Sequence, residues 1–374
     1  MLTSEKCFIW LLMVCGMMPF RLNATSGRFV ESIVYYWACV FLSVLYAIFA
    51  PLIYWNGIGS VMHPSTPLVN YMIVMQFVFT YSVVLLSRFE AITQCGKLMH
   101  LLNSILHLRE KTSLHTDVSL FEKRLARLLW FKVIVFDFAM LIICGAFFNP
   151  MQGRTLWNMI VGYGNMMLVS TMNMTVNFLL AVLYRAEHIY CQINVRVVEI
   201  MQGTKTPNEI VKLYLQHTDT TVTVQGMLEI LSIPLLLLNL WYFFVVVFAV
   251  FYTYTSVVQD MRSGGHFNIA NPITFLVSEV GQIYYMVTAS QKFTESARSI
   301  IQSLSCSTNR MVDDTNDQAV ELLTIEYLSR DYTVRIKGLY TIDNTMLFSV
   351  SNKVKKEVII IFPTDENYRF TDCC

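Results

Sequence analysis

The stretch ESIVYYWACVFLSVLYAIFAPLI, residues 31–53, contains one charged residue, Glu31, and that residue stands at its first position. A helix of about 20 predominantly apolar residues is long enough to cross the hydrocarbon core of a bilayer. A core that folds in water has no need for an uninterrupted apolar run of this length. The stretch therefore predicts a transmembrane helix, and it decides the class of the protein.

Other apolar runs of similar length follow along the chain. The composition agrees with them, because only 14% of the residues are charged, against about a quarter in soluble domains, and the mean hydropathy is +0.50. The sequence thus predicts an all-α, polytopic membrane protein of about seven spans. Besides 31–53, the predicted spans are 68–87, 128–148, 157–183, 228–257 and 271–290, with a weaker seventh span starting near Gly338.

Long amphipathic stretches separate some of these spans. They cover 88–126, 185–227 and 291–336, and their apolar residues recur at helical spacing, which predicts cytoplasmic extensions of the spanning helices. Pro234 is expected to kink the fifth span. The expected organisation is a cytoplasmic segment over 1–30, six spans with their extensions over 31–336, and a segment over 337–374 that holds the weaker seventh helix and a tail.

The distribution of Lys and Arg predicts the orientation. Twenty of them fall in the N-terminal segment and in the segments between spans two and three, four and five, and six and seven, where Arg127 and Lys337 lie just beyond the amphipathic stretches; the alternate loops hold only Arg154 and Arg262. Since basic loops stay in the cytoplasm, the N-terminus is expected inside, the reverse of a G-protein-coupled receptor. A signal peptide starting at Lys6 is the competing interpretation, and glycosylation of the Asn23 sequon would support it.

No catalytic or cofactor motif is found. The chain lacks a nucleophile elbow, a zinc-protease helix, a Walker loop and a dinucleotide fingerprint. The nine cysteines form no C-x-x-C pair, and none falls in an extracytoplasmic loop, so neither a metal site nor a disulfide framework is expected. The net charge of +1 gives no basic field for nucleic acid. We expect neither an enzyme nor a bound cofactor.

Polar residues inside the spans are the candidates for function, because intramembrane charges are costly and usually mark a site or a pairing. Lys132 and Asp137 fall in the third span, and the fourth span contains asparagines that include Asn173 and Asn177. Lys132 is near the cytoplasmic end and is expected to snorkel. Asp137 is deeper, where it either joins helices by hydrogen bonds or contacts a ligand.

The predicted orientation brings several of these side chains to the central and outer part of the membrane. A cluster of carboxylates and aromatic rings that opens outward suits a small organic ligand. The aromatic residues near span ends are equally compatible with interfacial anchors, and both interpretations stay open. The candidate ligand-binding residues are Tyr71, Asp137, Trp157, Tyr163, Glu279 and Gln282.

Two short pieces of sequence carry a family resemblance. The segment GMMPF at 16–20 resembles the G-h-h-P-F element that precedes the first span in many insect gustatory receptors. The segment YTVRIKGLYTIDNTMLF at 332–348 resembles the C-terminal signature of the same family, in which a basic segment leads into the last span. In length, layout and charge bias, the whole chain is similar to that family.

The resemblance implies a ligand-gated, non-selective cation channel in the plasma membrane of chemosensory neurons. It implies a homo- or heterotetramer with other gustatory receptor subunits, in which the last helix of each subunit lines a shared pore; in this chain that helix would present Val354, Val358 and Ile361. The ligands would be small-molecule tastants. Bitter compounds are the default class, because the chain matches neither the sugar nor the carbon dioxide subfamily.

The final segment departs from the family pattern T-Y-h-h-h-h-h-Q-F. Lys356 and Glu357 stand at the Thr and Tyr positions, and Pro363 and Thr364 replace Gln and Phe. Each central Lys would cost about 2.5–3.5 kcal/mol on insertion. Either a polar pore face accepts the charges, or the helix lies at the interface of a six-span protein, or the tail from Val354 onward is foreign sequence such as a retained intron. The last alternative would make the chain a non-conducting, truncated receptor.

Two other classes of membrane protein compete with the channel. A G-protein-coupled receptor is opposed by the inverted charge bias and by the lack of an outer disulfide. A transporter would show inverted repeats and helices broken by Gly or Pro at matching positions, which the sequence does not show.

Overall fold

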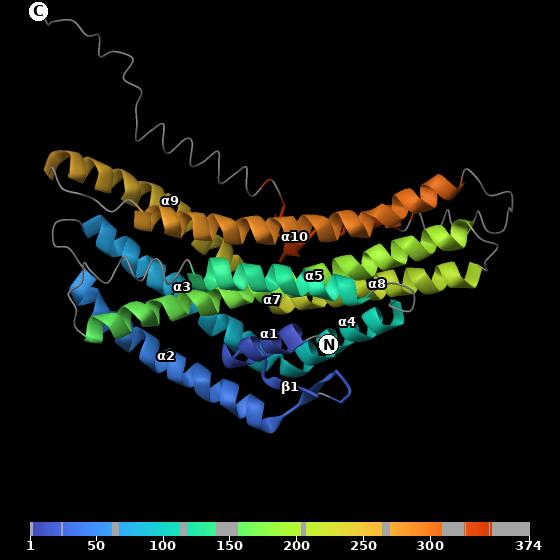
Figure 1. The fold of residues 1–374 in the computed structure, drawn as a ribbon, viewed down its shortest axis with the longest axis horizontal. Coiled ribbons are helices and arrows are strands. Elements are labelled where there is room, and N and C mark those ends of the chain that lie inside the picture. The colour runs from blue at the N-terminus through green and yellow to red at the C-terminus, as the bar shows by residue number, and fades with distance from the viewer. Residues whose placement is uncertain are drawn as a thin grey trace, which may run out of the picture.

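The computed structural model describes an elongated bundle of helices (Figure 1). It covers residues 3–23, 25–61, 67–112, 118–139, 156–202, 207–263, 270–308, 325, 327–343 and 345. Its helices are α1 (Thr3–Val14), α2 (Ile33–Val61), α3 (Pro67–Thr93), α4 (Cys95–Thr112), α5 (Val118–Phe131), the π-helix η2 (Lys132–Ala139), α7 (Leu156–Gln202), α8 (Pro207–Ile230), α9 (Ser232–Ser263) and α10 (Ala270–Thr308). Two antiparallel hairpins pair β1 (Phe20–Leu22) with β2 (Phe29–Glu31), and β3 (Arg335–Ile336) with β4 (Tyr340–Thr341).

The all-α, polytopic fold predicted from the apolar runs is confirmed. The runs at 31–53 and 68–87 lie in α2 and α3, those at 157–183 and 271–290 lie in α7 and α10, and the run at 228–257 lies mostly in α9. The run at 128–148 begins in α5 and continues as η2 to Ala139, beyond which it leaves the described residues. Of the last predicted span, the structure describes only the start, residues 338–343 and 345.

Helices α7 and α10 are much longer than a bilayer needs. With 47 and 39 residues, they extend about 70 and 60 Å, against about 30 Å of hydrocarbon. Figure 1 shows α2, α3 and α9 gathered along one half of these two helices, and α4 and α8 along the other half. Where the structure describes them, the amphipathic stretches form helices and helix extensions packed as a second part of the same bundle, except that the third stretch ends in β3. Their cytoplasmic placement stays a prediction.

Length and composition mark several described helices as able to cross a membrane. Within the described ranges these are Ile33–Trp55, Val74–Thr93 and Met167–Ile200, and a fourth is formed if Glu209–Ile230 and Ser232–Phe248 count as one broken span. These two segments meet at a 66° bend. Pro234 explains the bend, because it has no N–H for the carbonyl of Ile230, four residues earlier. The predicted kink is confirmed, a few residues before the proline itself.

Helix α2 presents an apolar stripe outward. Its exposed large side chains recur every three or four residues, which is the spacing of one helix face. A continuous apolar stripe of this kind would be unfavourable against water and is favourable against lipid. The stripe consists of Val34, Trp37, Phe41, Val44, Ile48, Leu52 and Trp55.

The N-terminal segment packs against the bundle. Phe8, Ile9 and Leu12 of α1 are buried in the hydrophobic core, as is Phe20 after the helix. Such burial favours a retained segment over a cleaved signal peptide, because cleavage would expose the surface that these side chains cover.

The predicted start of the last span near Gly338 is wrong. Lys337 and Gly338 both have positive φ, 47° and 67°, and they form the turn that joins β3 to β4. The basic, glycine-containing part of the C-terminal signature is therefore a hairpin, since a right-handed helix cannot include residues with positive φ. The next helical residue that the structure describes is Thr345.

A buried charge network as candidate functional site

The site is built around η2, an eight-residue π-helix that directly follows α5. Hydrogen bonds in a π-helix run from residue i to i+5, and such turns occur frequently at functional sites. Lys132 and Asp137 are five residues apart, so that the wide turn brings their side chains together. The Lys132 Nζ lies 3.3 Å from Asp137 Oδ1, and both side chains are fully buried. A regular α-helix, with 3.6 residues per turn, would point them to different sides.

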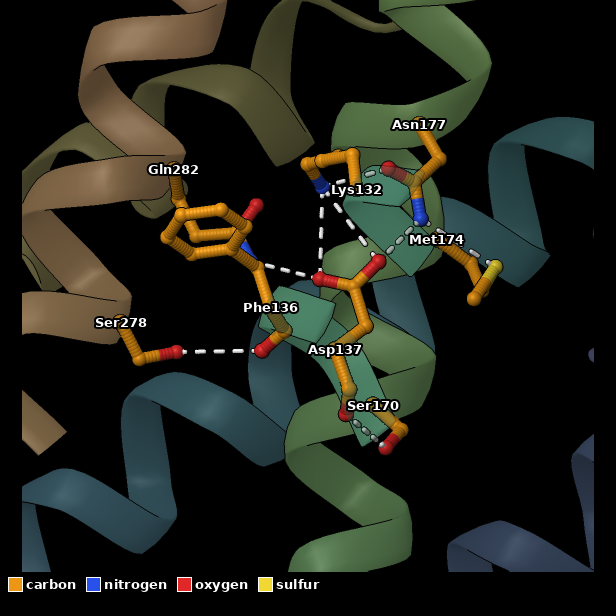
Figure 2. A network of polar contacts seen from close by, with 8 residues as sticks. All are labelled: Lys132, Phe136, Asp137, Ser170, Met174, Asn177, Ser278 and Gln282. Carbon is orange, nitrogen blue, oxygen red and sulfur yellow. Dashed lines mark hydrogen bonds and ion pairs between the residues drawn. The ribbon is translucent and has the colours of Figure 1, made fainter. Parts of the chain in front are cut away.

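Asp137 is fully satisfied by hydrogen bonds. Its Oδ1 accepts from Lys132 Nζ and, at 2.6 Å, from Gln282 Nε2 of α10. Its Oδ2 accepts from Asn177 Nδ2 of α7 at 2.5 Å and from Lys132 Nζ at 3.4 Å. Lys132 Nζ also donates to Asn177 Oδ1. Figure 2 shows these side chains converging on the Asp137 carboxylate from three helices. The carboxylate therefore joins η2, α7 and α10.

Two serines bind the backbone of η2. Ser170 Oγ of α7 donates to the Asp137 carbonyl at 3.2 Å, and Ser278 Oγ of α10 donates to the Phe136 carbonyl at 3.2 Å (Figure 2). Between them, Gly281 lets α10 approach the Phe136 ring, because a Cβ at this glycine would lie 2.6 Å from Phe136 Cε1. The π-helix is thus held between α7 and α10 by side-chain bonds and by a close contact.

Glu279 is the second buried carboxylate of the site, and its surroundings differ from those of Asp137. It is fully buried on α10, within electrostatic reach of Asp137 and Lys132. Neither of its oxygens completes a hydrogen bond with a described residue. The Trp241 indole of α9 lies beside the carboxylate without reaching hydrogen-bond geometry. One carboxylate of the cluster is therefore paired, whereas the other is not.

The predicted ligand-binding residues fall into three groups. The structure brings Asp137, Glu279 and Gln282 together in this cluster. Tyr71 of α3 is not part of it, since its side chain is 71% exposed. Trp157 and Tyr163 lie in α7, but their side chains are outside the described part of the structure, as are the predicted pore residues Val354, Val358 and Ile361.

The prediction that Lys132 snorkels to the membrane surface is wrong. Its side chain has no exposed surface and pairs with Asp137. Sequence reasoning missed this pair because it assumed regular α-helical spacing. The signal that could have found it is the five-residue separation of two opposite charges in one apolar span. For Asp137, the contacts favour the structural alternative, in which it joins helices.

Arg88 of α3 explains the G-h-h-P-F element. Its guanidinium donates from Nε to the Cys15 carbonyl at 3.0 Å and from Nη1 to the Leu42 carbonyl at 3.2 Å, and it stacks 4.7 Å from the centre of the Tyr46 ring. Gly16 has φ +74°, and its position against the Arg88 side chain leaves little room for a Cβ. The element is therefore the place where the N-terminal segment is fastened to the first two spans.

The C-terminal signature forms a docked hairpin with a helix cap. Ser290 Oγ of α10 donates to the Ile342 carbonyl at 2.6 Å, so the hairpin is attached to α10. Asp343 Oδ1 accepts from the Thr345 backbone N–H at 2.9 Å, which is the geometry of a helix N-cap. Gly338 and Asp343 of the signature thus have distinct roles, since Gly338 forms a turn and Asp343 caps a helix start.

Asp331 starts this segment. Its Oδ1 accepts from the Thr333 hydroxyl and backbone N–H, and its Oδ2 lies 2.9 Å from an Arg335 nitrogen. These hydrogen bonds, with the Arg335 charge, lower the pKa of the Asp331 carboxyl. The ionised carboxylate of Asp331 therefore stabilises the turn that leads into the hairpin.

The structure also has an apolar groove on its outer surface. The groove has a volume of about 230 Å³ and is lined by Leu45, Tyr46, Phe49, Ala50, Ile53 and Leu168. Its lining offers almost no polar surface to orient a ligand, and it opens next to the lipid-facing stripe of α2. It is therefore a weaker candidate for specific recognition than the charge network.

Comparison with known proteins identifies the fold. A model of the 7tm chemosensory receptor family matches residues 5–351. The structure of the insect olfactory receptor OR5 from Machilis hrabei superimposes with a TM-score of 0.69 and 11% sequence identity, covering 96% of this chain and 98% of that chain. The same receptor in complex with eugenol gives a TM-score of 0.66 and 11% identity, with 97% and 98% covered. A search of curated proteins finds no match.

Proposed function

Because the chain belongs to the 7tm chemosensory receptor family, we propose that it is a subunit of a ligand-gated cation channel of the gustatory type. The observation that carries this proposal is the family match over residues 5–351, which includes both short motifs of the sequence. The fold agrees, since nearly the whole chain superimposes on an insect olfactory receptor. The solved complex of that receptor holds eugenol, which supports a small organic molecule as ligand here too.

The gustatory assignment rests on the two motifs. The segment 16–20 is fastened by Arg88, and the segment 332–348 supplies the hairpin and the Asp343 cap. Each of the two segments thus has a defined structural role in this chain, which supports the resemblance to gustatory receptors. An olfactory receptor is the second candidate, favoured by the likeness to OR5. Matched panels of soluble tastants, with bitter compounds first, and of volatile odorants distinguish the two.

We place the ligand pocket above the charge network. Tyr71, Trp157 and Tyr163 would supply aromatic contacts, while Asp137, Glu279 and Gln282 would form the polar floor. Since Gln282 donates a hydrogen bond to Asp137, these two residues would act on a ligand indirectly, by fixing the position of the polar side chains beneath it. Both carboxylate oxygens of Glu279 and the Oε1 of Gln282 lack hydrogen bonds from described residues.

The proposed assembly is a homo- or heterotetramer with other gustatory receptor subunits in the plasma membrane. The last helix would line the pore with Val354, Val358 and Ile361, and the N-terminus would be cytoplasmic, as the bias in Lys and Arg predicts. Epitope tags at the N-terminus test the orientation: we expect antibody access only after permeabilisation. Glycosylation of Asn23 in microsomes would contradict it.

The decisive experiment is current recording in cells that express the full chain. A matched variant carries a last span with the T-Y-h-h-h-h-h-Q-F pattern in place of residues 349–374, so that ligand recognition and conduction are tested separately. We expect tastant-evoked cation current in that variant and a smaller current, or none, in the natural chain. Surface-expressed protein that stays silent in both forms, alone and with partner subunits, would contradict the channel.

A further inference from the structure

The buried cluster contains more negative than positive charge. Asp137 and Glu279 are carboxylates, Lys132 is the cation, and all three are fully buried. Among the described residues, the titratable groups that act on Glu279 are these two neighbours on η2, and the Trp241 indole of α9 lies beside it. Helix α7 presents Asn177 to the Asp137 carboxylate. An ionised Glu279 would therefore leave one uncompensated charge in a medium of low dielectric constant, where it is strongly unfavourable.

Lys132 cannot neutralise both carboxylates. Its ammonium has three donor hydrogens, and its contacts are with both oxygens of Asp137 and with Asn177 Oδ1. Asp137 receives two further bonds, from Gln282 and Asn177. The hydrogen bonds that the described residues of the cluster make to a carboxylate therefore all go to Asp137, and Glu279 is left without one.

Other buried oxygens of the cluster also lack a donor among the described residues. Gln282 is one turn along α10, and while its Nε2 binds Asp137, its Oε1 is buried without a hydrogen bond from a described residue. Asn173 of α7 is fully buried, and neither of its amide atoms has a partner among the described residues. It lies on the helix face of Ser170 and Asn177, both of which bind Asp137. Buried polar atoms without partners are rare and call for a missing water or ion.

We propose that this cluster binds one further monovalent cation at Glu279, an alkali-metal ion or a proton. The cation would make the buried charges sum to zero and would satisfy the Glu279 carboxylate. A sodium ion would in addition use the amide oxygens of Gln282 and Asn173, because hard cations take oxygen ligands. A proton would instead convert Glu279 into a hydrogen-bond donor. The proposal rests on the buried charges alone and does not depend on the proposed channel function.

The test measures the stability of the purified full chain in detergent. A ligand that binds the folded state alone raises the Tm by linkage. In one arm, sodium chloride replaces choline chloride at constant ionic strength and constant pH; a bound alkali ion would raise the Tm by about 5 °C at roughly a hundredfold excess over its Kd. In the other arm, the pH is varied in choline chloride; a bound proton would give a Tm that falls as the pH rises and does not respond to sodium.

The variant Glu279→Gln removes the excess charge and keeps the shape of the side chain. We expect this variant to be at least as stable as the wild type in choline chloride. Its Tm should not respond to sodium, and it should lack the pH dependence that Glu279 contributes. Glu295→Gln is the matched control, because Glu295 lies on the same helix with an exposed side chain; it should respond as the wild type does. Glu279→Met serves if the first variant does not fold, since buried charges are often replaced by apolar groups of similar volume without loss.

The outcomes decide the proposal. A sodium response that disappears with Glu279 identifies an alkali ion, and a pH response that disappears with it identifies a proton. If the Tm of the wild type responds to neither sodium nor pH, or if the Tm of a Glu279 variant responds in the same way as that of the wild type, the proposed cation site is wrong.

Discussion

Lys132 and Asp137 form an ion pair of 3.3 Å within a single π-helical turn, and neither side chain has exposed surface. The pair joins the third predicted span to the helices on either side of it, because the asparagine of α7 and the glutamine of α10 bind the same carboxylate. A buried pair of this kind is weak evidence for stability in itself, but breaking it leaves one charge without a partner.

Removing one member of this pair should therefore be worse than removing both. We expect Lys132→Met and Asp137→Asn each to lower the free energy of unfolding by about 3–5 kcal/mol, and the double variant to recover most of that loss. The measurement is thermal unfolding of the purified chain in detergent. The exposed pair Lys97–Glu229 is the control, since Lys97→Met should cost less than about 1 kcal/mol. Additive losses in the double variant would contradict the pairing.

Gly281 should be intolerant of a side chain. A Cβ there would lie 2.6 Å from the Phe136 ring, so Gly281→Ala is expected to destabilise the protein by about 1–3 kcal/mol through overpacking. Combining it with Phe136→Leu should restore part of the loss. The Tm of each variant checks this, with Gly96→Ala as control, because a Cβ at Gly96 meets nothing within 4 Å. Equal Tm values for the two alanine variants would refute the close contact.

Arg88 should be needed to hold the N-terminal segment. Arg88→Leu removes the hydrogen bonds to the Cys15 and Leu42 carbonyls, and bonds from a charged donor contribute about 1.5–3 kcal/mol each. We expect faster proteolysis after the first helix and faster alkylation of Cys15 in intact protein. Arg28→Gln is the control, because Arg28 is exposed. Unchanged rates in Arg88→Leu would mean that other contacts fasten the segment.

The turn of the C-terminal hairpin should respond in opposite directions to two substitutions. Gly338→Val places a β-branched residue at φ +67° and should cost about 1–2 kcal/mol. Lys337→Asn creates an Asn-Gly pair, the sequence that turns with two positive φ angles prefer, and should raise the Tm slightly. If Lys337→Asn lowers the Tm, the turn differs from the one described.

The cap at Asp343 makes a further prediction for the helix that follows. Asp343→Ala removes the acceptor of the Thr345 N–H and should destabilise the start of that helix by about 0.5–2 kcal/mol, whereas Asp343→Asn should retain most of the effect. In a channel this helix would lead into the pore, so current density at equal surface expression is the second measurement. Equal behaviour of the Ala and Asn variants would argue against a cap.

Much of the fold follows from the sequence because its determinants are local. An apolar run such as 31–53 needs no tertiary information to be recognised as a span, and the clustering of Lys and Arg in alternate stretches predicts which ends of the helices share one side. The proline at 234 likewise predicts a bend, since the missing N–H is a property of that residue alone. The extensions of α7 and α10 beyond the membrane follow from helical periodicity that continues after the apolar run ends.

The tertiary structure decided the site. Whether Lys132 reaches the surface or pairs with Asp137 depends on a local change from α- to π-helical winding. The five-residue separation of the two charges is compatible with that change but does not by itself require it. Gly338 lies between a basic segment and apolar residues, a sequence that is compatible with the start of a span. In the structure it lies in a hairpin, which is attached to α10 by the hydrogen bond from Ser290 to the Ile342 carbonyl. Which carboxylate is compensated, Asp137 rather than Glu279, depends on the rotation of three helices about their axes. The sequence by itself determined which segments are apolar enough to cross a membrane, because hydrophobicity is additive along the chain. The partners of their side chains were decided by packing, because a contact is a property of two helices at once.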